Sequence, residues 1–150
     1  GEGTVHRLWE PTKEKKNPST PYSAKFSVPY CVAVGFLRGD AGLNEFNESS
    51  IKDSEILELA NKVNYEVDPE NEYPKNYTGT LICETEDGTF TEHQACFRGG
   101  RKQPLTEDDM NKKYEANLKF SKISEEEKNN LNVFIDTIFE KPDFSKILIK

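Results

Sequence analysis

The stretch from Ser23 to Gly39 reads SAKFSVPYCVAVGFLRG, and apolar side chains crowd its body. Lys25, Ser27 and Tyr30 stand near its start. This pattern predicts a helix that is buried along its length and polar where it begins. Ser27 can cap the first turn, Pro29 is tolerated where the first N–H groups need no partner, and the final glycine can end the helix.

The start of this helix also carries chemistry. A helix N-terminus has partial positive charge and free N–H donors. We therefore predict a carboxylate-binding site there, formed with Lys25, Ser27 and Tyr30. Two interpretations of Tyr30 stay open at this point: a phenol that faces a substrate, or an aromatic residue of the core. Lys25 has a similar alternative, as an exposed loop cation.

Composition limits the class of protein. The chain has 150 residues, 34% hydrophobic and 31% charged, which suits one domain with a modest core. Its net charge of −7 disfavours a general nucleic-acid-binding role, because phosphate backbones require clustered cations. No apolar run is long enough to cross a membrane, and the N-terminus lacks the apolar segment of a signal peptide. We expect no membrane partner, and the start at Gly1 rather than Met favours a fragment of a longer chain.

Few residues offer metal or nucleophilic chemistry. The three cysteines are odd in number and lie in apolar or strand-like settings, which is typical of reduced cysteines in a cytoplasmic protein. No metal-ligand spacing is present, and His6 and His93 accompany no nucleophile motif. Lys13, Lys15 and Lys16, offset by Glu14, are interpreted as solvated surface.

The remaining pattern predicts an α+β fold, with an antiparallel sheet and helices in two layers. Asp87-Gly88 indicates a hairpin of Thr80–Glu86 and Thr89–Phe97 with a type I′ turn, and Asp53 can cap a helix that reaches Val63. We expect this helix and the Tyr30 helix to cover one face of the sheet. Further strands are predicted at Val5–Trp9 and Val63–Val67, and the connector Glu10–Pro21 is expected to hold no regular structure.

Two helices are predicted near the C-terminus. Thr106 can cap the first, which should run to about Phe120, and Ser124 with Glu127 forms a capping box for the second, which should stop at Lys141-Pro142. The apolar stripe of the second helix needs a partner surface, either on this domain or on a body outside the chain. We therefore divide the chain into a domain of residues 1–121 and a C-terminal helical segment of residues 122–150.

Several motifs in order along the chain resemble the MmgE/PrpD family. They are Pro18-Ser19-Thr20-Pro21-Tyr22, Ala24-Lys25-Phe26-Ser27, Pro29-Tyr30, Val32-Ala33, Gly39, the Asp53–Val63 helix, Asp87-Gly88-Thr89, Gly99 or Gly100, Pro104-Leu105-Thr106 and Lys113-Tyr114. Family members are longer and join a large helical domain to a smaller α/β lid. The resemblance implies that this chain is the lid of such an enzyme, with the final helices that return to the helical domain.

The resemblance also implies a function. The family includes 2-methylcitrate dehydratase, an enzyme of propionate catabolism, as well as cis-aconitate decarboxylase and iminodisuccinate epimerase. We expect a lyase that removes a proton next to a carboxylate of a small polycarboxylate and releases water or carbon dioxide, without a metal or organic cofactor. Tyr30 would be catalytic, and Lys25, Ser27 and Arg101 would bind substrate carboxylates.

Other consequences and alternatives follow. Most catalytic groups would lie in the missing helical part, so the isolated chain should be inactive, and the full-length protein should be a homodimer. Lys25 and the helix start are expected to help Tyr30 act as a base at neutral pH. The alternatives are an epimerase of the same family and a stand-alone binding module whose C-terminal helix docks a partner.

Overall fold

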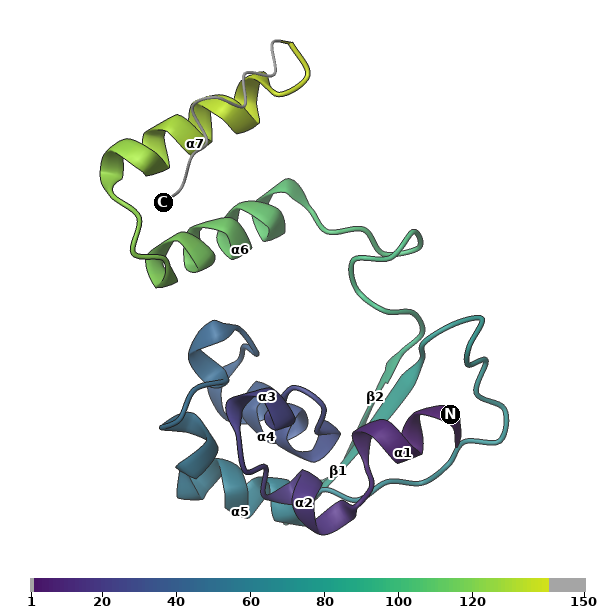
Figure 1. Ribbon diagram of the computed structural model, residues 1–150. Coiled ribbons are helices and arrows are strands. Elements are labelled where there is room, and N and C mark those ends of the chain that lie inside the picture. The colour runs from purple at the N-terminus through teal and green to yellow at the C-terminus, as the bar shows by residue number, and fades with distance from the viewer. Residues whose placement is uncertain (1, 141–150) are drawn as a thin grey trace. The chain divides into compact units, whose positions relative to one another are not determined.

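The computed structural model describes residues 2–140 and confirms the α+β class (Figure 1). Two compact units divide the chain, one of residues 1–106 and one that begins at Glu107. The predicted boundary after residue 121 concerns packing on a body outside this chain and stays a prediction. The elements of the first unit are η1 (Glu2–Thr4), α1 (Val5–Leu8), α2 (Thr12–Lys16), α3 (Pro21–Ala24), α4 (Val28–Arg38), η2 (Leu43–Glu45), η3 (Ser50–Lys52), α5 (Ser54–Lys62), β1 (Gly79–Thr85) and β2 (Gly88–Gln94). The second unit contains α6 (Glu107–Phe120) and α7 (Glu125–Thr137).

Helix α4 has the start and the end that the sequence predicts. The Ser27 hydroxyl accepts a hydrogen bond from the Tyr30 backbone N–H at 3.1 Å, and Pro29 lies in the first turn. Gly39 ends the helix with φ 72°, in the left-handed region that glycine adopts easily and residues with a Cβ atom rarely adopt. The capping chemistry therefore sets where the most buried helix of the chain begins.

Helix α5 also begins as predicted, at the Asp53 cap. The Asp53 carboxylate accepts from the Glu55 N–H at 3.0 Å and pairs with Arg38 of α4 at 2.5 Å. Burial opposes ionisation of Asp53, but Arg38 and the backbone N–H groups outweigh it and lower the pKa of the carboxyl. The cap of α5 thus also ties the end of α4 to the start of α5.

The core lies between helices. Among the described residues, the buried hydrophobic cluster lies in α3, α4, η3 and α5, and Phe46 and Leu59 pack against it. Figure 1 shows α4 and α5 next to each other in this helical part. The members of the cluster are Ala24, Tyr30, Ala33, Val34, Ile51, Ile56 and Ala60.

The hairpin is confirmed, but its surroundings differ from the expectation. Strands β1 and β2 pair antiparallel, with Thr85 opposite Gly88, and nearly every strand residue is exposed. Helices α4 and α5 therefore pack on each other and do not cover a face of this sheet. The type I′ turn is wrong: among the described residues only glycines have positive φ, so Asp87 does not, and Gly88 has φ 135°.

Three predictions for the first 67 residues are wrong. Val5–Leu8 is a helical turn, because Val5, Leu8 and Trp9 also have the i, i+3, i+4 spacing of one helical face. The connector contains helix α2, whose first N–H, that of Thr12, bonds to the Glu10 carboxylate at 2.9 Å. The extended segment 63–67 pairs with no strand of the described chain, so it is not part of a sheet.

The second unit is a pair of helices. The Ser124–Glu127 capping box is present, and the Tyr114 hydroxyl of α6 donates to Asn132 Oδ1 of α7 at 2.7 Å. Lys128 pairs with Glu115 at 3.7 Å. Part of the apolar stripe of α7 is exposed, including Ile135. Helix α7 ends at Thr137, earlier than predicted, and the expected stop at Lys141-Pro142 lies outside the described residues.

In the part of the chain that the structure describes, no helix combines the length and the apolar character needed to cross a membrane.

Candidate functional site

Tyr30 lies in the core, in the first turn of α4. Its side chain is 0% exposed, its ring lies 5.8 Å from that of Phe46, and its hydroxyl donates to the Glu45 carbonyl at 2.7 Å. Glu45 and Phe46 belong to the segment that follows α4. A substrate could reach the phenol only if this segment moved and the substrate replaced the Glu45 carbonyl as hydrogen-bond acceptor.

Burial sets the protonation of this phenol. Desolvation, with smaller effects from Cys31, Asp53 and Glu45, raises the pKa of Tyr30 to about 12. The sequence interpretation expected the opposite direction, with Lys25 and the helix start favouring the phenolate. In this structure Tyr30 is therefore a neutral hydrogen-bond donor at physiological pH, and its expected action as a base is not supported by its surroundings.

Alkaline pH should destabilise the protein through Tyr30. The folded pKa lies above the unfolded value of about 10, so this contribution to stability is complete below pH 10 and is lost as pH rises towards 12. Between pH 9 and pH 11.5 we expect a loss of about 2 kcal/mol in the free energy of unfolding, measured by urea titration at the two pH values. Tyr30→Phe should reduce the pH-dependent loss by that amount; an equal loss in both proteins would contradict the shift.

Ser27 is also buried, and its hydroxyl both donates and accepts a hydrogen bond. The oxygen accepts from the Tyr30 N–H, and the hydrogen is donated to the Lys15 carbonyl. A carboxylate could bind this hydroxyl only by displacing the Lys15 carbonyl. The structure thus explains Ser27 as the residue that joins α2 to the start of α4.

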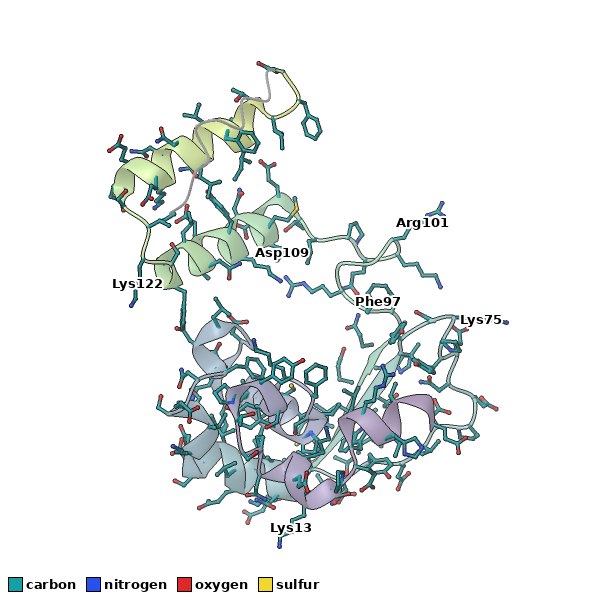
Figure 2. All side chains as sticks on the ribbon, viewed as in Figure 1. Lys13, Lys75, Phe97, Arg101, Asp109 and Lys122 are labelled. Atoms are coloured by element: carbon teal, nitrogen blue, oxygen red, sulfur yellow. The ribbon has the colours of Figure 1, made fainter. Side chains whose placement is uncertain are left out.

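Lys25 and Arg101 are exposed and lie apart from this network. Lys25 follows α3, and no hydrogen bond or ion pair within the described chain engages its ammonium group. Arg101 lies in the turn after β2, and its side chain extends away from the ribbon (Figure 2). No contact between the two cations is present among the described residues, so the structure brings Ser27 and Tyr30 together but not Arg101 with them.

Sequence reasoning missed the lysines of α2. Lys15 Nζ donates to the Arg7 carbonyl at 2.5 Å and to the Phe26 carbonyl at 2.8 Å. Lys16 Nζ donates to the Asn61 carbonyl and to Asn64 Oδ1, both at 2.9 Å. A Lys-rich stretch is typical of an exposed surface segment. Three of the four acceptors are main-chain carbonyls, which every residue has, so the sequence does not indicate these hydrogen bonds.

Residues 2–140 contain no cluster of metal-ligating side chains. No group of three or more His, Cys, Asp or Glu side chains gathers there as a metal site would require. Cys31, Cys83 and Cys96 are free thiols, and burial raises the pKa of Cys31, which favours the less reactive thiol form.

Comparison of the sequence with known proteins identifies a family. The family model described as the MmgE/PrpD C-terminal domain matches residues 3–137. The chain belongs to the MmgE/PrpD family. The match confirms the resemblance seen in the motifs, and in this MmgE/PrpD domain both Tyr30 and the residues that hold the start of α4 lie inside the matched range.

Two relatives of the MmgE/PrpD domain are cis-aconitate decarboxylases. Those of Mus musculus and Homo sapiens are each 31% identical over 105 residues. The aligned region is 67% of this chain and 21% of each relative. The matched part is therefore about a fifth of the length of these enzymes.

Proposed function

We propose that this chain is the C-terminal, lid-containing part of a lyase that acts on a small polycarboxylate. The observation that carries the proposal is the family match over residues 3–137, which includes the motif around Pro29-Tyr30. Both relatives described above are named as cis-aconitate decarboxylases, which favours loss of carbon dioxide over loss of water. Dehydration of a substrate such as 2-methylcitrate and epimerisation next to a carboxylate are the alternatives within the family.

In this proposal Tyr30 acts as an acid and not as a base. A phenol whose pKa is raised to about 12 keeps its proton at neutral pH, so it can donate a hydrogen bond to a substrate carboxylate or deliver a proton to the reacting carbon. Access to substrate requires the segment with Glu45 and Phe46 to open. The group that removes a proton would then come from the part of the enzyme outside this chain.

Two of the other site residues would bind carboxylates, and the third would support Tyr30. Lys25 and Arg101 are exposed cations that can approach a substrate held against the rest of the enzyme, and Ser27 would hold the helix start behind Tyr30. In this proposal the full-length protein is a homodimer and is located in the cytoplasm. It requires no metal or organic cofactor.

The test is a panel of substrates for the protein that the complete open reading frame encodes. Cis-aconitate, 2-methylcitrate, citrate and iminodisuccinate are supplied separately, and product formation is followed by chromatography with mass detection. The 150-residue chain is assayed beside it. Turnover by the full-length protein alone would support the proposal and identify the reaction; an open reading frame with no coding sequence beyond this chain would contradict it.

A second function rests on the exposed apolar side chains of α6 and α7. Met110, Phe120, Val133 and Ile135 are all largely exposed, although α6 and α7 contact each other. A stand-alone binding module would use this surface to dock a partner. A full-length enzyme would instead cover it with its own helical domain, so the length of the open reading frame also separates these two functions.

A further inference from the structure

The ammonium group of Lys15 joins two segments that are separate in sequence. It donates to the carbonyl of Arg7 in α1 and to the carbonyl of Phe26 in the turn before α4. Lys15 is half-buried, and within the described chain it forms no ion pair with a carboxylate. Its charge is therefore used to hold main-chain carbonyls.

The backbone of the same lysine holds the next residue. The Lys15 carbonyl accepts the hydrogen bond of the buried Ser27 hydroxyl, and that hydroxyl oxygen accepts from the Tyr30 N–H at 3.1 Å. The Ser27 carbonyl accepts from the Cys31 N–H at 3.0 Å. Lys15 thus contacts both Phe26 and Ser27, the two residues immediately before α4, through its side chain and its backbone.

We propose that Lys15 is a positioning residue, which fixes the Phe26–Ser27 turn and through it the first turn of α4 and the phenol of Tyr30. This inference rests on the proposed function, because the position of Tyr30 matters for a reaction only if Tyr30 takes part in one. It concerns α2, a helix of five residues that contains none of the expected site residues. Lys15 acts only through Phe26, Ser27 and Tyr30.

The neighbouring Lys16 provides a matched control. It is half-buried, lies on the same helix and also donates two hydrogen bonds, but its acceptors are Asn61 in the last turn of α5 and Asn64 just after that helix. Lys15→Met and Lys16→Met each remove one charge and two hydrogen bonds while retaining an unbranched chain. A general loss of stability should be similar in the two variants, whereas the local effects should differ.

The experiment measures amide hydrogen exchange and kinetics in the full-length protein. We expect K15M to speed exchange of the Tyr30 and Cys31 amides at least about tenfold more than K16M does, because K15M loses the two charge-assisted hydrogen bonds to the Arg7 and Phe26 carbonyls, and Phe26 directly precedes the Ser27 cap. K15M should also lower kcat at least about tenfold with KM nearly unchanged, and K16M should leave both close to the parent value. Lys15→Arg retains a charged donor, so its amide exchange and kcat should be close to those of the parent protein. If K15M does not fold, Lys15→Gln, whose uncharged side-chain amide has two N–H donors, takes its place.

The outcomes separate this inference from the proposed function. Equal exchange at Tyr30 and Cys31 in K15M and K16M would overturn the positioning role, whatever the activity. Faster local exchange with an unchanged kcat would overturn the part of the inference that links Lys15 to the reaction, since the helix start would then be irrelevant to turnover. If the parent protein turns over no substrate of the panel, the proposed function fails, and faster local exchange in K15M alone still supports Lys15 as the residue that positions Tyr30.

Discussion

Tyr30→Phe should lower kcat of the full-length enzyme by about a hundredfold or more, because positioned acid–base groups contribute roughly 10²–10⁴-fold. The substitution removes only the hydroxyl, so the buried ring and its contact with Phe46 remain. Steady-state kinetics with the substrate that the panel identifies would measure the effect. The lost hydrogen bond to the Glu45 carbonyl should cost only about 1 kcal/mol of stability, so the variant should remain folded.

Tyr65→Phe is the matched control for this prediction. Tyr65 also donates a hydrogen bond, to Glu10 Oε1 at 3.0 Å, and it lies in the same unit. It is outside the predicted site, so its kcat should stay within about twofold of the parent. Turnover of Tyr30→Phe at the parent rate would mean that Tyr30 is a residue of the core and nothing more.

Ile56→Ala should cause the largest loss of stability, about 2 to 5 kcal/mol, because deleting a buried aliphatic side chain leaves a cavity. Ile56 is 1% exposed and belongs to the cluster between α4 and α5. The free energy of unfolding would be obtained from urea titrations followed by circular dichroism.

Ile82→Ala tests the same chemical change on the hairpin. Ile82 of β1 is 60% exposed, so its replacement should change the free energy of unfolding by only about 0.5 kcal/mol. A larger loss for Ile82→Ala than for Ile56→Ala would show that the hairpin is buried in the protein in solution, by another domain or another copy.

Local capping chemistry explains why much of the helical structure could be predicted. Ser27, Asp53 and Ser124 each cap a helix within a residue or two of the predicted position, since a cap depends only on neighbours in sequence. Gly39 is equally local, because a positive φ is easiest for glycine. These residues determine where α4, α5 and α7 begin and where α4 ends along the sequence.

Packing over longer distances could not be predicted in the same way. The apolar residues of α4 fit a helix that covers a sheet or one that packs on another helix, and only the fold shows that α5 is the partner. Val5–Trp9 has both alternating and helical spacing, so its sequence does not distinguish a strand from a turn of helix. The bond between Trp9 N–H and the Val5 carbonyl at 3.0 Å shows the helix.

The candidate site was predicted in part. The family motifs identify the segment that contains Lys25, Ser27 and Tyr30, and the structure joins Ser27 to Tyr30 by a hydrogen bond. The degree to which Tyr30 is enclosed, and hence the direction of its pKa shift, depends on Glu45 and Phe46, which follow in the next segment. The role of α2 was missed because it depends on contacts between segments distant in sequence.

The hydrogen bonds of Lys15 imply an uneven tolerance to substitution. Both of its acceptors are main-chain carbonyls, those of Arg7 and Phe26. Other side chains at these two positions would therefore leave both hydrogen bonds in place, as long as the backbone keeps its path. Only the lysine must keep its length and its charge. A search for pairs of positions that vary together would therefore overlook this link, although a single change at position 15 would break it.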